Sequence, residues 1–487
     1  MVCRLHPLHL NLGDLQVATF ITSLKWIVYA ALALLTAIAL SWWLVPDEAL
    51  DPEAAHFVAQ PASPPSARNA SFMIWGLAAS PELDPHAVGR RIVATQDRME
   101  AAQRDSSEFK EQEFLGANPL TLPKENKPLC DAERENCLLV YQKMPAEIDQ
   151  EITSRKVFLE RYRSIRNYEE FVSANSKITE TTALPNWRPV LHMSELVNAS
   201  IALDMRFKDR RGVALKELAA DVRSWRKILT ANDWLITQMI AVIALHRKYR
   251  LASEIMNAYP EVIDLYPDLM QTITAPIPVA EAGIVSAVKT EARVSMQYLW
   301  NLGLRDQSIS LWKFDRTNAG DILGPIGAKV AYQPHASIND AHAAFSIIAS
   351  HLAKPPKEYL VTDAAFKEEL AQATRFRPQD IFYNFAGRLG LHLGLPDLSK
   401  YYFRMHDLVG LTRLVDLQRR IIAAKLPPQR VGESLSAFGA ELMDPYTGQP
   451  MQWNASSKQL SFVLHGKRFA NFGFVAVAPV PGTQQAK

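Results

Sequence analysis

The sequence predicts a mainly α-helical protein with an N-terminal transmembrane helix, a helical-hairpin body and a small C-terminal β hairpin. Three observations support this fold class. Residues 26–45 form an uncharged apolar run, glycine is sparse at 20 of 487 residues, and apolar residues recur at helical spacing over most of the chain from residue 148 onward. A hydrophobic content of 48% is ample for one large core or two modest cores.

The run WIVYAALALLTAIALSWWLV, residues 26–45, has the length and composition of a membrane span. A helix rises about 1.5 Å per residue, so about 20 apolar residues cross a hydrocarbon core of about 30 Å. Trp26 and Trp42 lie near its two ends, where aromatic rings favour the headgroup region. A cleaved signal peptide is the alternative, but its apolar region is usually shorter, at about 7–15 residues.

The charges on either side of this run predict its orientation. Arg4 and Lys25 precede it, whereas four acidic residues and no Lys or Arg stand between positions 46 and 67. Basic residues near a span favour the cytoplasmic side, which makes residues 1–25 a cytoplasmic tail. The expected location is therefore the inner (cytoplasmic) membrane, with a single pass, a lipid bilayer contacted through residues 26–45, and a periplasmic body.

Five prolines in residues 46–70 predict a linker, followed by a helical periplasmic body at residues 71–440. Within the body, Cys130 and Cys137 enclose the polar stretch CDAERENC. Two thiols in an oxidising compartment are expected to pair, and closing so short a loop contributes roughly 2–3 kcal/mol. A metal site would need more ligands than these two thiolates, and no nearby histidine supplies them.

The clearest helices of the body are expected at residues 215–229, 234–245, 281–299 and 397–424. Residues 191–257 resemble consecutive helix hairpins of the kind that stack in TPR-like arrays, without a fixed 34-residue repeat. The turn-forming sequence DPYTGQP then introduces two short strands, which predicts a small β hairpin within residues 441–478. Residues 479–487 are expected to form a disordered tail.

A serine nucleophile with a lysine base is one candidate chemistry. Ser286 and Lys289 match the SxxK motif of penicillin-binding proteins, and the sequence Ser337-Ile-Asn339 resembles the second box of that family. The third box should be Lys-Thr-Gly, but Tyr446 stands in place of the lysine that would hold a substrate carboxylate. SxxK also occurs at 224–227 and 310–313, and the helical context does not fit, so no catalytic residue is assigned.

Histidine and glycine clusters provide no stronger site. His335, Asp340 and His342 lie close together in sequence, as do His406 and Asp407, but neither group has the HExxH spacing of a zinc protease. Gly387, Gly390 and Gly394 do not form a GxGxxG motif after a strand, so close helix packing or a helix end explains them better. No metal and no cofactor is expected.

Basic residues are concentrated between positions 206 and 250. Eleven Lys and Arg against four acidic residues give this stretch a charge of +7, compared with +2 for the whole chain. Cations near helix C-termini are favoured by the helix dipole, which is the simplest explanation. The alternative is a partner-binding surface for an anionic surface or an acidic domain; its candidate residues are Arg206, Lys208, Arg210, Arg211, Arg223, Arg226, Lys227, Arg247, Lys248 and Arg250.

Three stretches carry a resemblance to known sequences. They are the segment from Asn69 through GLAASPELDPHAVGR, the LxxDxRxWR pattern that begins at Leu218, and the C-terminal DPYTGQPMQW. Together they resemble a family of uncharacterised bacterial single-pass envelope proteins. The resemblance implies an inner-membrane, periplasm-facing protein and carries no assigned activity or catalytic residues.

Two functions are therefore expected as alternatives. The first is a membrane-anchored interaction or scaffold protein of the bacterial cell envelope, whose helical body binds an envelope protein or an anionic partner. The second is an envelope hydrolase that acts on cell wall or peptide, with catalytic residues that the sequence does not reveal. A near-neutral net charge of +2 gives no signature of nucleic-acid binding, and the oligomeric state is left open.

Overall fold

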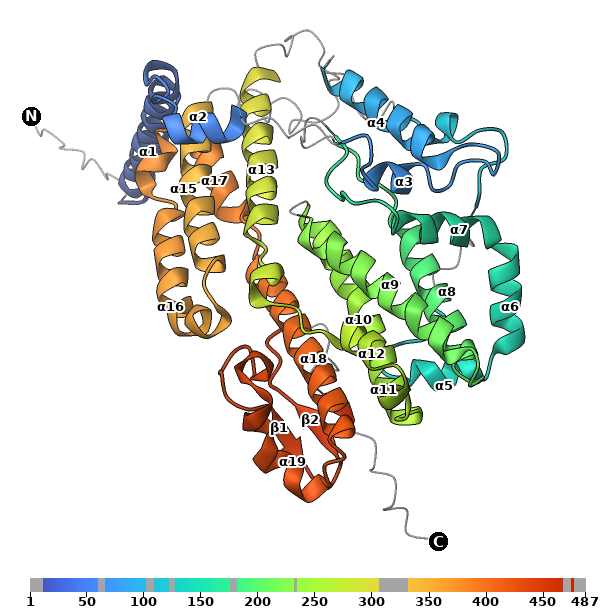
Figure 1. The fold of residues 1–487 in the computed structure, drawn as a ribbon. Helices are drawn as coiled ribbons and strands as arrows, with labels where there is room; N and C mark the ends of the chain where they lie inside the picture. Colours follow the sequence, from blue (N-terminus) through green and yellow to red (C-terminus); the bar gives the residue numbers. More distant parts are fainter. Residues whose placement is uncertain are drawn as a thin grey trace, which may run out of the picture. The chain divides into compact units, whose positions relative to one another are not determined.

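A computed structural model describes residues 12–59, 66–101, 109–121, 128–175, 182–231, 234–305, 332–466 and 474–476. The described chain is mainly helical and has a small antiparallel sheet near the C-terminus, which confirms the predicted fold class at this level (Figure 1). The predicted tail at 479–487, residues 60–65 of the predicted linker, and Ser310 with Lys313 lie outside the described residues.

The described helices of the first half are α1 (Leu12–Leu44), α2 (Pro52–Ala59), α3 (Ser71–Trp75), α4 (Pro85–Ala101), α5 (Cys137–Gln142), α6 (Pro145–Ser154), α7 (Lys156–Ile165), α8 (Arg188–Asp204) and α9 (Arg211–Thr230). Those of the second half are α10 (Leu235–Ala258), α11 (Val262–Leu265), α12 (Pro267–Thr274), α13 (Val285–Arg305), α15 (Pro334–Leu352), α16 (Pro356–Ala373), α17 (Phe385–Gly394), α18 (Ser399–Ala423) and α19 (Pro428–Ser434). Short 3₁₀ turns lie at η2 (Glu111–Phe114), η3 (Val279–Ala282), η5 (Pro378–Ile381), η6 (Leu435–Phe438) and η7 (Ala440–Leu442).

The described residues fall into two compact units. Unit 1 contains those of Met1–His56, Tyr298–Ala344 and Ala371–Leu395, and unit 2 contains those of Phe57–Gln297, Phe345–Leu370 and Pro396–Lys487. Each unit therefore combines stretches that are far apart in the sequence. Long-range contacts, rather than neighbouring segments alone, build both of them.

The core of unit 2 is formed by α8, α9 and α10 together with α18. α10 packs against α8, α9, α12 and α18, and this surrounding explains why its sequence is apolar on more than one face (Figure 1). Leu245, Tyr249 and Ile255 of α10 are completely buried. The prediction that residues 234–245 form the buried centre of the body is confirmed for most of this helix, with Ile236 as an exposed exception.

The C-terminal sheet belongs to unit 2 and contains β1 (Gln452–Asn454), β2 (Gln459–Ser461) and β3 (Phe474–Ala476). The strands are antiparallel in the order β1-β2-β3, and Leu460 of β2 pairs with Trp453 on one side and with Val475 on the other. The sheet packs on α18. Gly410 permits this approach, because a Cβ atom there would overlap the ring of Phe462.

In unit 1, the segment that follows α1 is tied to the start of α15. The carboxylate of Asp47 accepts hydrogen bonds from the backbone N–H groups of His335 at 2.7 Å and Ala336 at 3.1 Å. Asn339 donates to the carboxylate of Glu48 at 2.6 Å and accepts from the N–H of Asp51 at 2.9 Å. Asp47 thus satisfies the N-terminal donors of a helix that begins 287 residues later.

α2 lies within the segment that the sequence predicts as a linker. The Asp51 carboxylate accepts from the N–H of Glu53 at 2.7 Å, and Pro52 occupies the first helical position. An Asp-Pro-Glu sequence is a typical helix start, because proline already has a helical φ and the acidic groups favour the positive end of the helix dipole. The number of prolines in this segment predicts a linker and does not indicate this helix start.

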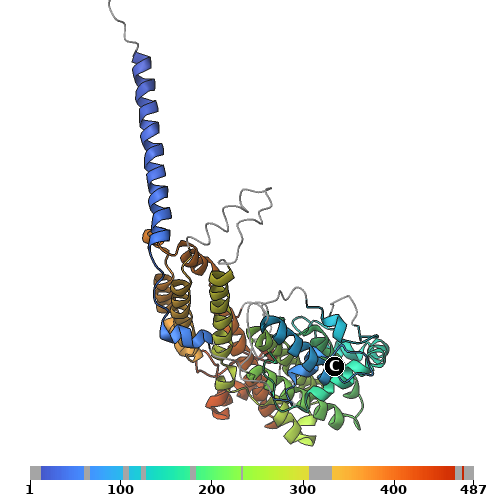
Figure 2. The same ribbon diagram turned by 90° about the horizontal axis from the view of Figure 1, so that it is seen from above.

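The membrane assignment of residues 26–45 is wrong. α1 is one continuous helix (Figure 2), but within the described part of the chain no helix has both the length and the apolar character that a bilayer crossing demands. A crossing needs about 20 consecutive apolar residues. The single-pass topology, the cytoplasmic N-terminus and the periplasmic body are corrected accordingly.

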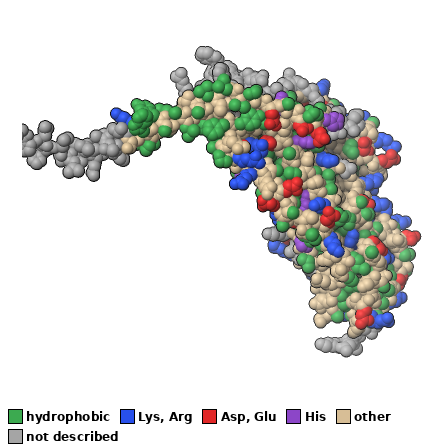
Figure 3. All heavy atoms as spheres, turned by 90° about the vertical axis from the view of Figure 1, so that its left-hand side faces the viewer, with side chains coloured by type: hydrophobic (Ala, Val, Ile, Leu, Met, Phe, Trp, Pro, Cys, Tyr) green, Lys and Arg blue, Asp and Glu red, His purple; other side chains and the backbone are tan. Residues whose placement is uncertain are grey.

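The described side chains of α1 are nevertheless largely hydrophobic and exposed. Figure 3 shows them along the helix, where Trp26, Ile27 and Leu35 are each more than half exposed.

Candidate functional site

The basic residues of positions 206–250 separate into an inward-facing group and an exposed group. The inward-facing group consists of Arg211, Arg226, Arg247, Lys248 and Arg250. Arg226 pairs with Glu281 at 2.9 Å, and Arg247 pairs with Glu195 at 3.6 Å. Arg211 pairs with Glu261 and lies over the ring of Tyr259. These cations hold neighbouring helices together, so they are poorly placed to meet a partner.

Lys248 is the most extreme member of the inward-facing group. Its side chain is completely buried and forms an ion pair with Asp221 of α9. Asn198 accepts a second hydrogen bond from it at 3.1 Å. Tyr162 donates to Asp221 at 2.7 Å and accepts from the indole N–H of Trp225 at 2.9 Å. Burial lowers the pKa of Lys248, and the carboxylate of Asp221 opposes that effect.

The helix-end explanation applies to only part of the basic stretch. Arg206, Lys208 and Arg210 follow the C-terminus of α8, and Lys227 lies in the last turn of α9. By contrast, Arg247 to Arg250 lie well inside α10, which continues to Ala258. For Arg247 and Lys248, ion pairing with Glu195 and Asp221 replaces the helix dipole as the physical reason.

The exposed group forms what we call the basic strip. It begins in the turn between α8 and α9 and continues along one face of α9; its members are Arg206, Lys208, Arg210, Lys216, Arg223 and Lys227. The α9 members are spaced seven and four residues apart, which places them on the same face of the helix. Val213 belongs to this face too and is 65% exposed. From Val213 to Lys227 the row extends about 21 Å at 1.5 Å per residue.

An exposed aromatic ring lies at the beginning of the basic strip. Phe207 is 48% exposed, and the guanidinium groups of Arg206 and Arg210 lie 5.8 Å and 5.1 Å from the centre of its ring. Cations at this distance from an aromatic face are attracted by the ring. The turn therefore offers an apolar surface between two positive charges.

Acidic groups near the basic strip are few and are partly engaged. Asp204 pairs with Arg210 at 3.4 Å. Glu217 accepts from Arg163 at 3.0 Å and from Arg166 at 2.8 Å, so its charge is directed toward α7. Asp209 is exposed within the turn. Six exposed cations against one exposed carboxylate give this strip a strongly positive surface.

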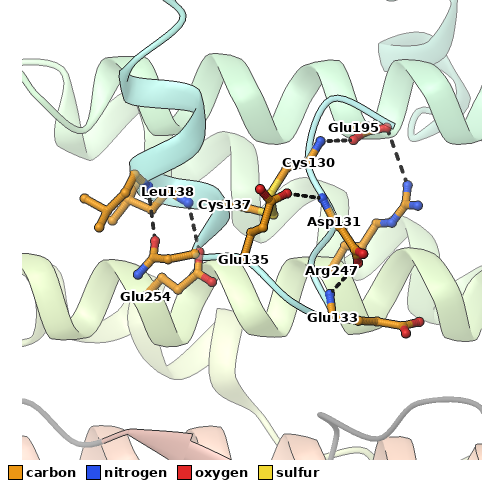
Figure 4. Close-up of a disulfide and its surroundings, with 11 residues drawn as sticks. Cys130, Asp131, Glu133, Glu135, Cys137, Leu138, Glu195, Arg247 and Glu254 are labelled. Carbon is orange, nitrogen blue, oxygen red and sulfur yellow. Dashed lines mark hydrogen bonds and ion pairs between the residues drawn. A yellow bond between two sulfur atoms is a disulfide. The ribbon is translucent and has the colours of Figure 1, made fainter. Parts of the chain in front are cut away.

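The predicted disulfide between Cys130 and Cys137 is confirmed, and it closes a loop that is fixed to the core by two buried carboxyl groups (Figure 4). Glu195 of α8 accepts from the backbone N–H of Cys130 at 3.1 Å. Glu254 of α10 accepts from the N–H of Leu138, in the first turn of α5, at 2.9 Å. The loop therefore joins α5 to both α8 and α10.

Both of these carboxyl groups have perturbed protonation equilibria. Burial raises the pKa of Glu254 to about 7, and the hydrogen bonds from the backbone at Leu138 and Cys137 oppose this effect only in part. Burial also raises the pKa of Glu195, although Arg247 favours its ionised form. Tyr141 of α5 lies beside Glu195, and burial raises the pKa of its phenol well above the usual range.

The remaining candidates of the sequence serve structural contacts. The Ser337 hydroxyl donates to the backbone oxygen of Gln333 at 2.8 Å, as expected inside a helix. His406 is buried, which lowers its pKa to about 3. Asp407 accepts from the hydroxyl of Tyr446 at 2.7 Å and from the N–H of Gly466 at 2.7 Å, and thereby attaches the DPYTGQP turn to α18.

The three glycines of α17 differ in their surroundings. A Cβ at Gly387 would overlap the side chains of Ser337 and Asn384, so this residue allows close packing, as predicted. Gly394 ends the helix, which is the other predicted use. Gly390 has open space around it and serves neither purpose.

Metal ligation has no candidate in the described ranges, where no three His, Cys, Asp or Glu side chains are grouped to hold an ion. No protein-family model, curated protein or solved structure matches the chain.

Sequence reasoning identified the cations but not the acids that pair with the inward-facing ones. These acids are Asp221, Glu195, Glu261 and Glu281, and each lies at least 27 residues from its cation in the chain. A partial signal exists, since an acidic residue on the apolar face of a predicted helix requires a partner. The sequence does not say which partner it finds.

Proposed function

We propose that this protein is a non-catalytic interaction protein that binds an acidic segment of another protein through the basic strip. The supporting observation is the set of six exposed cations in the turn after α8 and on one face of α9. Cations of the inward-facing group lie inside the fold, and the exposed six form a mainly positive surface, although Arg210 pairs with Asp204. A surface of one sign attracts partners of the opposite sign and orients them.

The shape of the strip favours an elongated acidic segment. Its α9 portion, from Lys216 to Lys227, extends about 16 Å, which is about 11 residues of helix or about 5 residues of extended chain. Phe207 and Val213 add exposed apolar surface among the charges. A binding surface that combines apolar contacts with charge suits a peptide segment better than a single small anion, because a small anion would use only one or two of the cations.

The structural role of the inward-facing cations supports their separation from the basic strip. Lys248 and Arg247 contribute to the packing of α10, and replacing them would disturb the fold. Lys216 and Arg223 are exposed and have no such role in the contacts described above. The strip can therefore be altered without removing the ion pairs of the core.

The test is binding of a fluorescein-labelled peptide of repeating Glu-Glu-Ala to the full-length chain, measured by fluorescence anisotropy. We expect binding that weakens as salt is raised, because exposed charge pairs are screened. A peptide with Gln in place of every Glu should not bind. The triple variant K216E/R223E/K227E should weaken binding at least tenfold, since each reversed charge removes about 0.5–1 kcal/mol or more.

The matched control is R134E/K357E/R430E, which makes the same change in net charge at three exposed positions away from the strip. This variant should retain most of the affinity. Equal weakening by both triple variants would mean that only the overall charge matters, and the proposal would be wrong. Equal binding of the Gln peptide would exclude recognition of acidic groups.

A further inference from the structure

The exposed side of α9 forms a narrow surface that extends along the helix. The opposite side packs against α8, α10 and α12, and Leu218, Val222 and Trp225 are buried there. We call the exposed side the outer face of α9; its residues follow one another at steps of three and four positions, and they are Val213, Lys216, Ala220, Arg223, Lys227 and Thr230. Residues at this spacing lie on one side of a helix. All of them are exposed except Ala220, which is half-buried.

Three cations of the basic strip lie almost in line on the outer face. Lys216, Arg223 and Lys227 fall within about 40° of one another around the helix axis, because a turn contains about 3.6 residues. Steps of seven and four residues separate them, which correspond to about 10.5 Å and about 6 Å along the axis. Ala220 lies between the first two, and its small side chain leaves room for a second backbone to approach.

These intervals match the side-chain spacing of a helix better than that of an extended chain. On a helix, residues four and seven positions apart share one face and lie about 6 Å and about 10.5 Å apart. In an extended chain, the residues of one face recur at about 6.7 Å and about 13 Å. An extended segment therefore matches the interval between Arg223 and Lys227 but not the one between Lys216 and Arg223, whereas a helix matches both.

The two acidic residues of α9 leave its outer face positive. Asp221 is buried and pairs with Lys248. Glu217 lies beside the outer face, and its carboxylate accepts from two arginines of α7 at 3.0 Å and 2.8 Å. The ammonium group of Lys227 donates to the backbone oxygen of Tyr168 at 3.5 Å, and this uncharged acceptor leaves its positive charge in place. A helix whose carboxylates face this surface is therefore attracted to it.

We infer that the acidic partner segment binds as an α-helix lying along α9, with carboxylates four and seven residues apart opposite Lys216, Arg223 and Lys227. This inference rests on the proposed function and adds the conformation and the residue spacing of the partner segment. Packed helices lie about 8–10 Å apart. The aliphatic parts of lysine and arginine side chains pack against such a neighbour while their charged ends reach its carboxylates.

The first experiment compares labelled peptides for binding to the full-length chain by fluorescence anisotropy. Each has about 18 residues of alanine and glutamine with four glutamates, which is long enough to cover the outer face. The one-face peptide carries the glutamates at positions i, i+4, i+7 and i+11, so that either chain direction places three opposite the cations. The distributed peptide carries them five residues apart, all around the helix. The one-face peptide should bind at least about fivefold more tightly, because each surface ion pair changes the affinity by up to about fivefold.

A third peptide tests the conformation directly. It is the one-face peptide with proline in place of the residue at i+5, which faces away from the glutamates. Proline inside a helix breaks it without changing the charge, so this peptide should bind as weakly as the distributed peptide. Equal binding of the proline peptide and the one-face peptide would overturn the helical inference.

Charge exchange at one position then tests the alignment. Arg223→Glu should weaken binding of the one-face peptide, whereas Arg430→Glu, the matched control at an exposed position elsewhere, should not. Four further peptides each carry lysine in place of one of the four glutamates. The peptide whose lysine lies opposite residue 223 should bind Arg223→Glu more tightly than the one-face peptide does. If none of the four shows this gain, the carboxylates do not align with the cations of α9, and the inference is wrong.

Ala220→Trp tests the close approach of a second helix without a change in charge. It should weaken binding of the one-face peptide, while Ala365→Trp, at an exposed position of α16, should leave it unchanged. Circular dichroism checks that both variants remain folded. Normal binding of the one-face peptide to folded Ala220→Trp would mean that no helix packs on the outer face.

The same measurements separate failure of this inference from failure of the proposed function. If the one-face, distributed and proline peptides bind equally well and all lose affinity in K216E/R223E/K227E, the basic strip binds acidic segments but not as aligned helices. If none of the three acidic peptides binds, the proposed function is wrong and the helical alignment with it.

Discussion

Glu254 illustrates how one buried side chain makes stability depend on pH. Burial raises its pKa from 4.5 to about 7, so the fold favours the protonated carboxyl group. Its contribution is fully present below about pH 4.5 and is lost as the pH rises through 7, a change on the order of 3 kcal/mol. Relative to the unmodified chain, Glu254→Gln should therefore become more stable between pH 5 and pH 8. Urea unfolding midpoints at several pH values measure this difference.

Glu217 provides a control, because its pKa is shifted in the opposite direction to that of Glu254. Burial alone would raise its pKa, but Arg166 and Arg163 outweigh burial and lower the pKa below its ordinary value. Its contribution is present above the ordinary pKa near 4.5 and is lost as the pH falls below it. Glu217→Gln should accordingly lose more stability at pH 7 than at pH 4. If the stability change of both variants, relative to the unmodified chain, varied with pH in the same direction, these carboxyl groups would not determine the pH dependence.

Lys248 and Asp221 allow a test of how a buried ion pair contributes. Lys248→Met leaves the Asp221 carboxylate buried without its cation, and the expected loss in free energy of unfolding is about 3–5 kcal/mol. Adding Asp221→Asn removes the isolated charge and retains an acceptor for the hydroxyl of Tyr162. The double variant should therefore recover much of the loss, as measured by urea unfolding. A double variant that is less stable than Lys248→Met would contradict this explanation.

At the scale of elements, the contact between α3 and α4 depends on two glycines. A Cβ at Gly89 would overlap the backbone of Phe72, and a Cβ at Gly76 would overlap the backbone of Pro85. Neither backbone can move aside without separating the helices. Gly89→Ala should therefore lower the free energy of unfolding by about 1–3 kcal/mol or more.

The matched change is Gly390→Ala in α17, where a Cβ meets open space. Alanine is favoured over glycine in a helix interior by about 0.8–1 kcal/mol, so this variant should become more stable. Thermal unfolding followed by circular dichroism distinguishes the two variants by the sign of the shift in Tm. A stabilised Gly89→Ala would show that α3 and α4 do not pack this closely.

Local sequence patterns predict much of the secondary structure of this protein but little of its pairing. The helix at residues 215–229 and the strand around Leu460 follow from spacing and turn residues, since both signals act over a few positions. The Asp-Pro-Glu start of α2 is also local, although the prolines around it favour a linker. The partners of Lys248 and Glu254 come from other helices, so the sequence shows these charges without showing that they are buried.

At the scale of the whole molecule, the two units should open separately. Asp47 accepts from two N–H groups at the start of α15 within unit 1, whereas α10 lies entirely in unit 2. Loss of a helix cap costs about 0.5–2 kcal/mol, and a change of one or two kcal/mol alters an opening equilibrium about 5- to 30-fold. Asp47→Ala should therefore accelerate amide exchange by up to this factor in the first turns of α15.

Hydrogen–deuterium exchange with mass spectrometry measures α15 and α10 in the same sample. We expect exchange in α10 to remain unchanged, because proteins open in cooperative units that differ in stability. Asp209→Ala is the control, since it removes an exposed carboxylate of unit 2 and should leave α15 unaffected. If Asp47→Ala accelerates exchange equally in α10, the two units form one cooperative body and do not open separately.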